Sequence, residues 1–376
     1  MSPALPTNDE DTLKKGGVRV LVAAGSSGGH IFPALSFLDA LKQKGKNIET
    51  LLLLPQNCIL DRAEYASENI KYISIISNKP GFNLRKVVFV FNLLKGFLQS
   101  LVVLLEFHPD IVVGFGSLAS VPAIFFAWMF RMSTLIHEQN VIPGRANLLL
   151  SMFADRIAVS FSQSRNYFKI NRKKIVYTGN PIRRQMAKVD GPEALNFFGL
   201  EQGKFTILVM GGSQGSRRIN LEFLKAASVG PRFQVIHLAG NADFDLLKAK
   251  YAALNLKVKL FKFLKEMHYA YSACDLVISR AGAATISEIT YFQVPAILIP
   301  YPYAYAHQSA NAGVLKDAGC AVVIKDEELN GLGLSKDIEY LLNHPDKIKN
   351  MRLAYQDFLM PQAGHALASE ALALNA

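Results

Sequence analysis

The sequence is short of cysteine. Its 376 residues include three cysteines, Cys58, Cys274 and Cys320, which are scattered and form no Cys-x-x-Cys pair. An odd, scattered set is typical of a reducing compartment and excludes a disulfide framework or a cysteine-rich zinc site. Residues 1–17 are polar and lack the apolar core of a signal peptide, so we expect a loose tail there.

Acidic residues are also scarce, but only in the first half. Residues 1–184 hold 22 Lys and Arg against 12 Asp and Glu, whereas residues 185–376 hold 19 against 18. Half of the chain is hydrophobic, 19% is charged and the mean hydropathy is +0.18. A basic, apolar half suits an anionic membrane surface or an acidic ligand. No motif with interleaved aromatic and basic residues supports nucleic-acid binding, the competing interpretation.

The dinucleotide fingerprint G-x-G-x-x-G is absent where a Rossmann fold would place it. A strand predicted at residues 18–24 runs into the loop 25–30 (GSSGGH), followed by a helix predicted at 33–41. Pro33 would lie near the first turn of this helix, where its missing N–H costs nothing. The next strand, at 50–54, ends without the acidic residue that holds an adenosine ribose. A nicotinamide or flavin enzyme is therefore disfavoured.

No apolar stretch passes as an uninterrupted membrane span. Residues 111–130 carry no charge, but Gly114, Gly116 and Pro122 divide them into a strand, a loop and a helix. Residues 87–105 predict a helix with a wide apolar arc. This helix is either a membrane-surface patch or an element buried on both sides. Its narrow polar stripe comprises Asn92, Lys95, Gln99 and Glu106.

The second half repeats the pattern of the first. A strand at 205–210 runs into the loop 211–216 (GGSQGS), which begins 186 positions after the first glycine loop. Such self-similarity is typical of two doubly wound α/β domains. We expect one domain at 18–184, a linker at 185–204 and a second domain at 205–356. A terminal helix within 357–376 should pack back on the first domain.

A pair of aspartates, Asp243 and Asp245, raises the question of a metal. An Asp-x-Asp pair can hold a divalent cation on a nucleotide diphosphate. Here the pair directly precedes a predicted helix, so N-terminal capping is the favoured interpretation. The sequence therefore predicts no metal and no cofactor.

Two further motifs follow predicted strands, where open α/β sheets bind ligands. Residues 137–147 (HEQNVIPGRAN) concentrate polar side chains after a short apolar strand. Residues 279–288 (SRAGAATISE) form a strand-to-helix turn whose backbone N–H groups suit an anion. Glu288 lies about one turn into that helix, where it could accept hydrogen bonds from sugar hydroxyls. The alternative is an ordinary turn with a solvated glutamate.

Taken together, six motifs in order resemble one family. They lie at residues 25–33 (GSSGGHIFP), 137–147, 178–183 (TGNPIR), 211–216, 279–288 and 307–311 (HQSAN). The chain resembles the bacterial undecaprenyldiphospho-muramoylpentapeptide β-N-acetylglucosaminyltransferases of glycosyltransferase family 28. It departs from the usual second glycine loop at Ser117 and Leu118, where relatives carry glycine and tyrosine. Ser27 replaces the usual threonine.

The resemblance implies a GT-B fold, two Rossmann-like domains facing across a cleft. It implies inverting, metal-independent transfer of GlcNAc from UDP-GlcNAc to the 4-hydroxyl of MurNAc in lipid I, giving lipid II for peptidoglycan synthesis. It also implies a peripheral enzyme on the cytoplasmic face of the inner membrane, with cell-wall and division proteins as partners. The alternatives are another GT-B transferase, a UDP-sugar epimerase, or a binding protein without activity.

The resemblance also implies roles for single residues. His30 is the candidate base, with phosphate contact as its alternative, and Glu138 is the second candidate base or the group that orients the first. Arg183 would add charge toward the diphosphate. The donor-binding set comprises Ser27, Gly28, Gly29, Asn140, Arg183, Ser213, Leu264, Ala283, Ala284, Thr285, Ile286, Ser287, Glu288 and Gln308.

Overall fold

The computed structural model describes most of the chain. The described residues are 17–45, 47–56, 71–75, 85–212, 214–229, 232–303, 306–358, 360 and 362–375, with backbone alone at 85–90, 184 and 357. Cys58, Ser213 and nearly all of the tail predicted at residues 1–17 lie outside them. Cys274 and Cys320 are buried, and neither forms a disulfide with a described residue.

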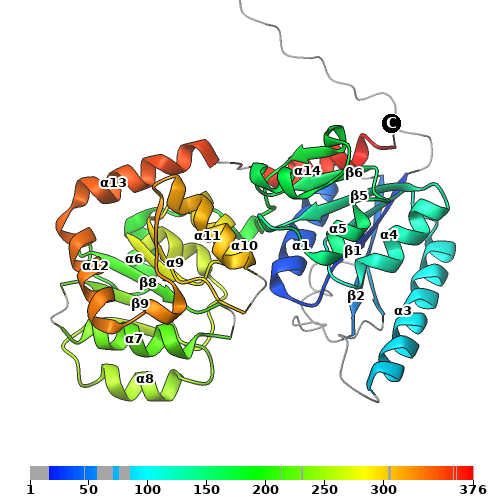
Figure 1. The fold of residues 1–376 in the computed structure, drawn as a ribbon. Helices are drawn as coiled ribbons and strands as arrows, with labels where there is room; N and C mark the ends of the chain where they lie inside the picture. The colour runs from blue at the N-terminus through cyan, green and yellow to red at the C-terminus, as the bar shows by residue number, and fades with distance from the viewer. Residues whose placement is uncertain are drawn as a thin grey trace, which may run out of the picture. The chain divides into compact units, whose positions relative to one another are not determined.

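The chain forms two compact units. Unit 1 comprises Met1–Gln139, Pro143–Pro181 and Gln362–Ala376, and unit 2 comprises Asn140–Ile142 and Ile182–Pro361. Each has its own parallel sheet with helices on its faces, so the predicted doubly wound α/β architecture is confirmed. Figure 1 shows the elements of both units.

The sheet of unit 1 has seven described parallel strands in the order β3-β2-β1-β4-β5-β6-β7. Alternate residues of β1 enter two cores, Val20 and Val22 on one face and Leu21 and Ala23 on the other. Both faces are buried because helices cover both. The strands are β1 (Val18–Ala23), β2 (Ile48–Pro55), β3 (Tyr72–Ile75), β4 (Ile111–Gly114), β5 (Ser133–Glu138), β6 (Arg156–Val159) and β7 (Ile175–Tyr177).

One face of this sheet carries α1 (Gly28–Lys44) and α14 (Ala363–Leu372), which pack against each other. The end of the chain is tied to the same unit, because the Ser133 hydroxyl donates to the Leu374 carbonyl at 2.9 Å. The other face carries α3 (Arg85–Phe107), α4 (Ser120–Met129) and α5 (Arg145–Leu150).

The first helix begins earlier than predicted. Its first turn closes on the Ser27 carbonyl, which accepts from the N–H groups of His30 and Ile31. The helix therefore starts at Gly28, and Pro33 lies inside it. The expectation that Pro33 occupies the first turn is wrong, and the missing N–H leaves one intrahelical hydrogen bond unmade.

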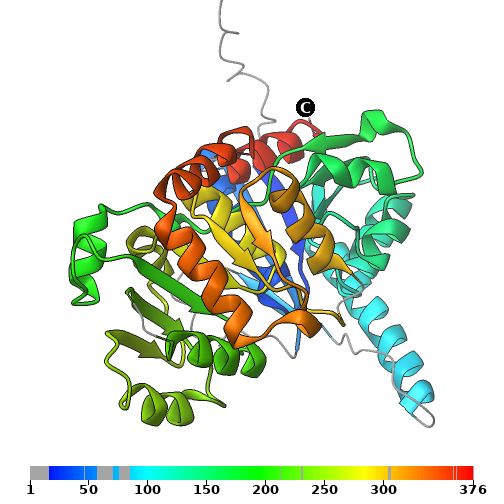
Figure 2. The ribbon, with the colours of Figure 1, turned by 60° about the vertical axis from the view of Figure 1, so that its left-hand side comes forward.

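Helix α3 settles one alternative left open by the sequence. Its residues Val103 and Leu104 are buried, and Phe97 packs edge-on against Phe126 of α4. The opposite face is exposed, so the prediction of a helix buried on both sides is wrong. We call the following side chains the apolar face of α3: Phe91, Leu94, Leu98, Val102 and Leu105, which are 49% to 67% exposed. Figure 2 shows α3 beside the rest of unit 1.

The sheet of unit 2 has six described parallel strands in the order β10-β9-β8-β11-β12-β13. They are β8 (Thr206–Met210), β9 (Gln234–Leu238), β10 (Val258–Phe261), β11 (Leu276–Ser279), β12 (Ala296–Leu298) and β13 (Ala321–Val323). The principal helices are α6 (Gly191–Phe197), α7 (Arg217–Ala227), α8 (Phe244–Tyr251), α9 (Met267–Ala273), α10 (Ala283–Phe292), α11 (His307–Asp317), α12 (Gly331–Asn343) and α13 (Pro345–Leu353).

Three further observations complete the fold. Helix α11 starts at His307, so the whole HQSAN motif at residues 307–311 lies within it. The uncharged stretch 111–130 forms β4, a loop and α4, as predicted. Among the residues that the structure describes, no helix combines the length and apolar character needed to cross a membrane.

Candidate functional site

The predicted glycine loops all lie at points where strand order reverses. In unit 1 the reversal falls between β1 and β4, where Ala23 pairs with Gly114. In unit 2 it falls between β8 and β11, where Met210 pairs with Ser279. The loops that follow these four strands therefore leave each sheet side by side. Open α/β sheets bind ligands at such switch points, outside the carboxyl ends of the strands.

The loop after β8 touches the loop after β9 through backbone alone. Gly215 has φ +80° and Gly240 has φ +78°. A Cβ on Gly215 would lie 2.2 Å from the Ala239 carbonyl oxygen, and a Cβ on Gly240 would lie 2.3 Å from the Gln214 oxygen. Both conformation and space therefore require glycine at the two positions. Ser213, the predicted phosphate contact in this loop, lies outside the described residues.

A buried polar network supports this loop from below. The Asn220 amide donates to the Ala239 carbonyl at 2.9 Å and to Asp243 at 3.0 Å. His237 Nε2 donates to Asn220 Oδ1 at 3.1 Å, and its Nδ1 accepts from the Tyr251 hydroxyl at 2.8 Å. Burial lowers the pKa of His237 to about 3, so the ring is neutral.

Asp243 belongs to that network and does not cap a helix. It occupies the position before α8, but its side chain makes no capping hydrogen bond. Its carboxylate accepts from Asn220 and from Arg217 Nη1, the latter at 3.0 Å. The capping prediction is wrong because these two partners hold the carboxylate. Among the described residues, no three His, Cys, Asp or Glu side chains gather closely enough to hold a metal ion.

The loop after β11 presents the start of α10. Gly282 is the residue before the helix and offers no side-chain cap, so the first-turn N–H groups of Ala283, Ala284 and Thr285 have no capping side chain. Ile286 is buried, and the Ser287 hydroxyl donates back to the Ala283 carbonyl at 2.8 Å. An anion at this end of a ten-residue helix would meet N–H donors and the positive end of the helix dipole.

Glu288 is largely buried on the second turn of α10, not solvated. The Tyr271 hydroxyl donates to its Oε2 at 2.9 Å, and Arg183 Nη2 lies 4.0 Å from its Oε1. Burial raises the pKa of Glu288, whereas Arg183 and Tyr271 oppose this rise. The alternative of a solvated surface glutamate is therefore wrong. Arg183, predicted to face a diphosphate, contacts this carboxylate.

Gln308 and Asn140 lie in a network around a residue that the sequence did not single out. Asn311 is fully buried; its amide donates to Asn140 Oδ1 at 3.1 Å and to the Ala281 carbonyl at 3.2 Å. Gln308 Oε1 accepts from the N–H groups of Ala281 and Tyr301. The Gln308 amide nitrogen is thus directed away from these backbone donors and is suited to a ligand acceptor.

Arg280 is a second residue beside the switch point for which the sequence analysis gave no role. Its guanidinium is buried and pairs with Asp326, donates to Ser216 Oγ at 2.9 Å and stacks over Tyr301. Arg280 therefore links the loop after β11 to Ser216, the residue directly before α7. Its position within a small-residue turn was the available signal. Leu264, a member of the predicted donor-binding set, is buried three residues after β10.

In unit 1 the candidate base lies on the first turn of α1. His30 Nδ1 lies 2.7 Å from the Phe115 carbonyl oxygen, which can only accept, so Nδ1 carries the proton. A neutral ring then has its lone pair on Nε2. Ser27 precedes the helix without a side-chain capping bond, and Gly28 and Gly29 provide its first N–H groups. This end of α1 is the predicted diphosphate contact.

The departure at Ser117 has a structural consequence. Ser117 adopts φ +71°, a left-handed conformation that favours glycine. Its side chain lies over Gly25, where an added Cβ would be 2.5 Å from Ser117 Cβ and 2.9 Å from His30 Cδ2. Ser117 thus fills the space between the two glycine loops of unit 1, beside the His30 ring. Leu118 is exposed.

In residues 137–140 (HEQN), the first three side chains are buried and Asn140 is half-buried, and several of their hydrogen bonds reach groups outside the segment. The Glu138 carboxylate accepts from Asn147 Nδ2 at 2.8 Å and from the Gly144 N–H at 3.0 Å. His137 Nε2 donates to the Gly179 carbonyl, and burial lowers the pKa of His137 to about 4. Gln139 Nε2 donates to His137 Nδ1 and to the same Phe115 carbonyl that holds His30.

Both halves of the chain match known domains. Residues 20–159 match the glycosyltransferase family 28 N-terminal domain, and residues 206–365 match the family's C-terminal domain. These ranges contain the four loops at the two switch points.

Curated relatives match nearly end to end. The UDP-N-acetylglucosamine–N-acetylmuramyl-(pentapeptide) pyrophosphoryl-undecaprenol N-acetylglucosamine transferase of Thermodesulfovibrio yellowstonii is 36% identical over 93% of this chain and 97% of its own. The enzyme of the same name from Listeria monocytogenes is 34% identical over 95% of this chain and 99% of its own.

Solved structures agree. Acinetobacter baumannii MurG superposes with a TM-score of 0.76 at 26% identity, over 95% of this chain and 99% of that one. A UDP-GlcNAc 2-epimerase from Neisseria meningitidis shares only the fold, with a TM-score of 0.67 at 16% identity over 95% and 100% of the two chains. The predicted GT-B fold and the resemblance on which it rested are therefore confirmed, and the chain belongs to the MurG family of glycosyltransferase family 28.

Proposed function

We propose that the protein transfers GlcNAc from UDP-GlcNAc to the 4-hydroxyl of MurNAc in undecaprenyl-diphosphate-linked MurNAc-pentapeptide. The observation that carries the proposal is the pair of switch points, each lined by glycine loops in the order typical of this family. Relatives at 34% and 36% identity carry the name of this activity and match the chain nearly end to end.

Unit 2 would hold the donor. The N–H groups of Ala283, Ala284 and Thr285 would bind the diphosphate with the α10 dipole, which stabilises negative charge without a bound cation. The Glu288 carboxylate would accept from the ribose hydroxyls. Leu264 would read uracil through its backbone. Ser213 and Arg183 would contact the phosphates, and Gln308 and Asn140 the GlcNAc hydroxyls.

The reaction is a single displacement with His30 as the base. The acceptor 4-hydroxyl attacks the anomeric carbon from the face opposite UDP, and its proton passes to His30 Nε2. The bond from the anomeric carbon to the UDP oxygen breaks, and UDP leaves with the bonding electrons, so the configuration inverts. The Nδ1–H bond to the Phe115 carbonyl fixes the tautomer that leaves Nε2 basic.

Glu138 fits a positioning role better than that of a base. Its carboxylate is 2% exposed and already accepts two hydrogen bonds from Gly144 and Asn147. These bonds shape the turn that carries Asn140. We therefore assign proton removal to His30 and loop geometry to Glu138.

A transfer assay with His30→Asn tests the proposal. Asparagine can keep the hydrogen bond to the Phe115 carbonyl but provides no base. Product formation from UDP-GlcNAc and a lipid I analogue should fall by about 10²- to 10⁴-fold, while the Kd for UDP-GlcNAc changes little. His344→Asn, at the exposed residue directly after unit 2's α12, is the matched control.

Two results would contradict the proposal. Unchanged turnover in His30→Asn would remove His30 as the base. Conversion of UDP-GlcNAc to another UDP-sugar without any acceptor would indicate an epimerase and overturn the transferase assignment. UDP-glucose offered in parallel measures donor specificity.

We further propose that unit 1 binds the cytoplasmic face of the membrane that holds the acceptor. Trp128, Met129 and Phe130 are also exposed, at the end of α4, which packs against α3. Lys95 of α3 and Arg131, two residues after α4, are exposed as well. An apolar surface with flanking cations suits an anionic lipid interface.

Vesicle co-sedimentation tests this surface. Leu94→Ser with Leu98→Ser should weaken binding to vesicles containing anionic phospholipid by about tenfold or more, since two exposed leucines leave the interface. Leu332→Ser, at a comparably exposed leucine of unit 2, is the control. Equal binding of both variants would refute the assignment. Association with cell-wall and division proteins remains an expectation from the family.

A further inference from the structure

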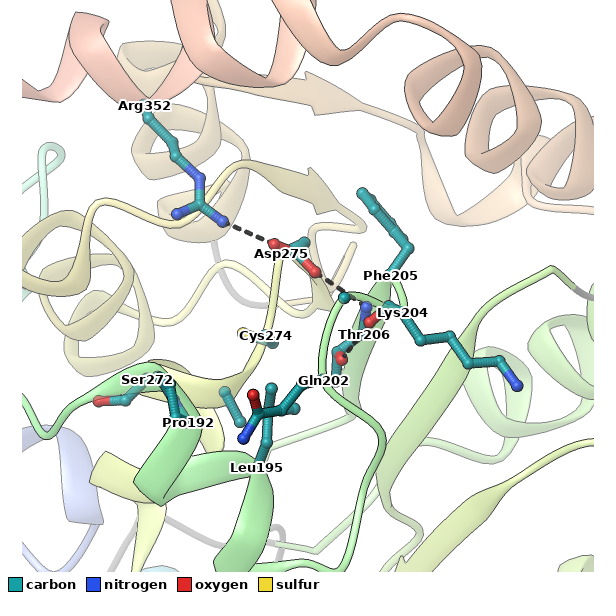
Figure 3. A pocket seen from close by; sticks show the side chains of 13 residues that line it. Pro192, Leu195, Gln202, Lys204, Phe205, Thr206, Ser272, Cys274, Asp275 and Arg352 are labelled. Carbon is teal, nitrogen blue, oxygen red and sulfur yellow. Dashed lines mark hydrogen bonds and ion pairs between the residues drawn. The ribbon is translucent and has the colours of Figure 1, made fainter.

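A cavity of about 550 Å³ opens at the end of the unit 2 sheet opposite the glycine loops (Figure 3). It reaches Thr206, the first residue of β8, and Asp275, just before β11. The glycine loops follow the other ends of these strands. A strand of five residues spans on the order of 15 Å, so this cavity is separate from the proposed donor site.

Four segments of unit 2 line the cavity. Pro192 and Leu195 come from α6, Gln202 and Phe205 from the loop before β8, and Arg352 from α13. Ser272 and Cys274 complete the wall at the end of α9. The volume falls within the range of small-molecule sites, and both polar and apolar residues line the cavity.

The acidic side chain of the lining is already engaged. Asp275 Oδ2 accepts from the Thr206 N–H at 3.0 Å, and its Oδ1 accepts from Arg352 Nη2 at 3.1 Å. Burial raises the pKa of Asp275, and these two contacts oppose the rise. The carboxylate therefore serves to hold Arg352 in place and has little capacity left for a cationic ligand.

The remaining side-chain groups are rich in donors. Ser272 Oγ accepts from the Val189 N–H at 3.2 Å, which leaves its own proton to donate. Arg352 uses one nitrogen for Asp275 and has further N–H groups. Gln202 adds an amide. Figure 3 shows Arg352, Ser272 and Gln202 among the side chains that line the pocket; the Ser272 hydroxyl points away from Gln202, and the Lys204 side chain extends away from Asp275.

The charge around the cavity points the same way. Lys188 lies close enough to Arg352 for the two charges to repel, and the pKa of Lys188 is lowered by its burial and by this repulsion. Lys188 is held by neutral groups, the Gln293 amide oxygen at 3.1 Å and the Tyr291 ring. Lys188 thus adds positive charge near Arg352, outside the residues that line the cavity.

We propose that this cavity is a second ligand site of unit 2, which takes a small oxyanion bearing phosphate or carboxylate groups. Arg352 anchors the anion through its guanidinium, and the Gln202 amide donates to a remaining oxygen. The occupant contacts both α6 and α13, which are the first and the last α-helix between residues 182 and 361 of unit 2. The site does not depend on the proposed transfer reaction.

Isothermal titration calorimetry tests the site directly. The full chain is first titrated with UDP, which fills the donor site, and then with inorganic phosphate and with citrate. Saturable binding of at least one anion is expected. Arg352→Gln should weaken that binding by about tenfold or more and leave the Kd for UDP unchanged. Arg232→Gln, at an exposed arginine paired with Glu339 elsewhere in unit 2, is the matched control.

A second variant tests the site independently, in case Arg352→Gln fails to fold. Leu195→Trp fills the cavity without touching its charges and should abolish anion binding at unchanged UDP affinity. No saturable binding of either anion, or equal binding in wild type, Arg352→Gln and Leu195→Trp, overturns the proposal. Because UDP and the anions are titrated in sequence, failure of the donor site and failure of this site give different results.

Discussion

Replacing Glu288 by glutamine separates donor binding from folding. The side chain is 16% exposed, accepts from the Tyr271 hydroxyl at 2.9 Å and lies 4.0 Å from Arg183. In the proposed complex its carboxylate accepts from the ribose hydroxyls of UDP. Glutamine has nearly the same shape but only one acceptor oxygen and no charge. We therefore expect a defect in binding with little change in packing.

The magnitude follows from the contacts. A hydrogen bond to a charged group contributes about 1.5–3 kcal/mol, so the Kd for UDP should rise by about 10- to 100-fold. Stability should behave differently. Burial raises the pKa of Glu288, so the folded chain keeps a proton where the unfolded chain has lost it. The charged form is thus unfavourable for folding at neutral pH, and its removal should leave the unfolding temperature equal or higher.

Calorimetric titration with UDP over a range of pH gives the test. In the wild type the Kd should rise as the pH falls through the raised pKa of Glu288, because the protonated carboxyl loses an acceptor. The variant should show no such dependence. Glu339→Gln, at an exposed glutamate of the same unit, is the control. A Kd for UDP within twofold of wild type in Glu288→Gln would refute the ribose assignment.

Three further outcomes are expected. Ser117→Gly should raise the free energy of unfolding by up to about 1 kcal/mol, because it relieves a left-handed conformation, whereas Ser117→Ala should not; equal values for both variants would contradict the strain. Buried His137 and His237 have pKa values of about 4 and about 3, so the unfolded chain binds more protons than the folded chain below pH 6.5. The free energy of unfolding should therefore decrease as the pH falls below 6.5, by up to about 1.4 kcal/mol per pH unit for each ring. His237→Gln should flatten that slope in urea titrations, and an unchanged slope would contradict a neutral buried ring. Arg280→Met should cost up to about 3 kcal/mol, because Asp326 loses its partner at 2.6 Å and keeps Arg218 Nε at 3.8 Å. Arg280→Met with Asp326→Leu should recover most of this loss in the same assay; no recovery would contradict the pairing.

The strands and loops at the switch points could be predicted because their signals are local. A strand buried on both faces reads as an apolar run, and the glycine loops directly follow such runs in β1 and β8. The short edge strands β3 and β13 were missed. They have three or four residues and only partly buried side chains, so their patterns are weak.

The residues missed at the candidate site share a different cause. Asn311 bonds to Asn140, 171 positions away, and Arg280 bonds to Ser216, 64 positions away. Asp243 was taken for a cap because its true partner, Asn220, lies 23 positions earlier. Local spacing predicts what a residue can do near its neighbours in sequence. Which residue from a distant part of the sequence contacts it depends on the fold.

The short stretch Asn140–Ile142 has a consequence for engineering. It counts with unit 2, where Asn311 Oδ1 accepts from the Val141 N–H at 3.0 Å and His307 donates to the Ile142 carbonyl at 2.8 Å. A donor half excised as residues 182–361 would lose these three residues and leave a fully buried amide short of partners. Chimeras that exchange donor halves between relatives should therefore carry residues 140–142 from the same parent, although the sequence places them 40 positions before the junction.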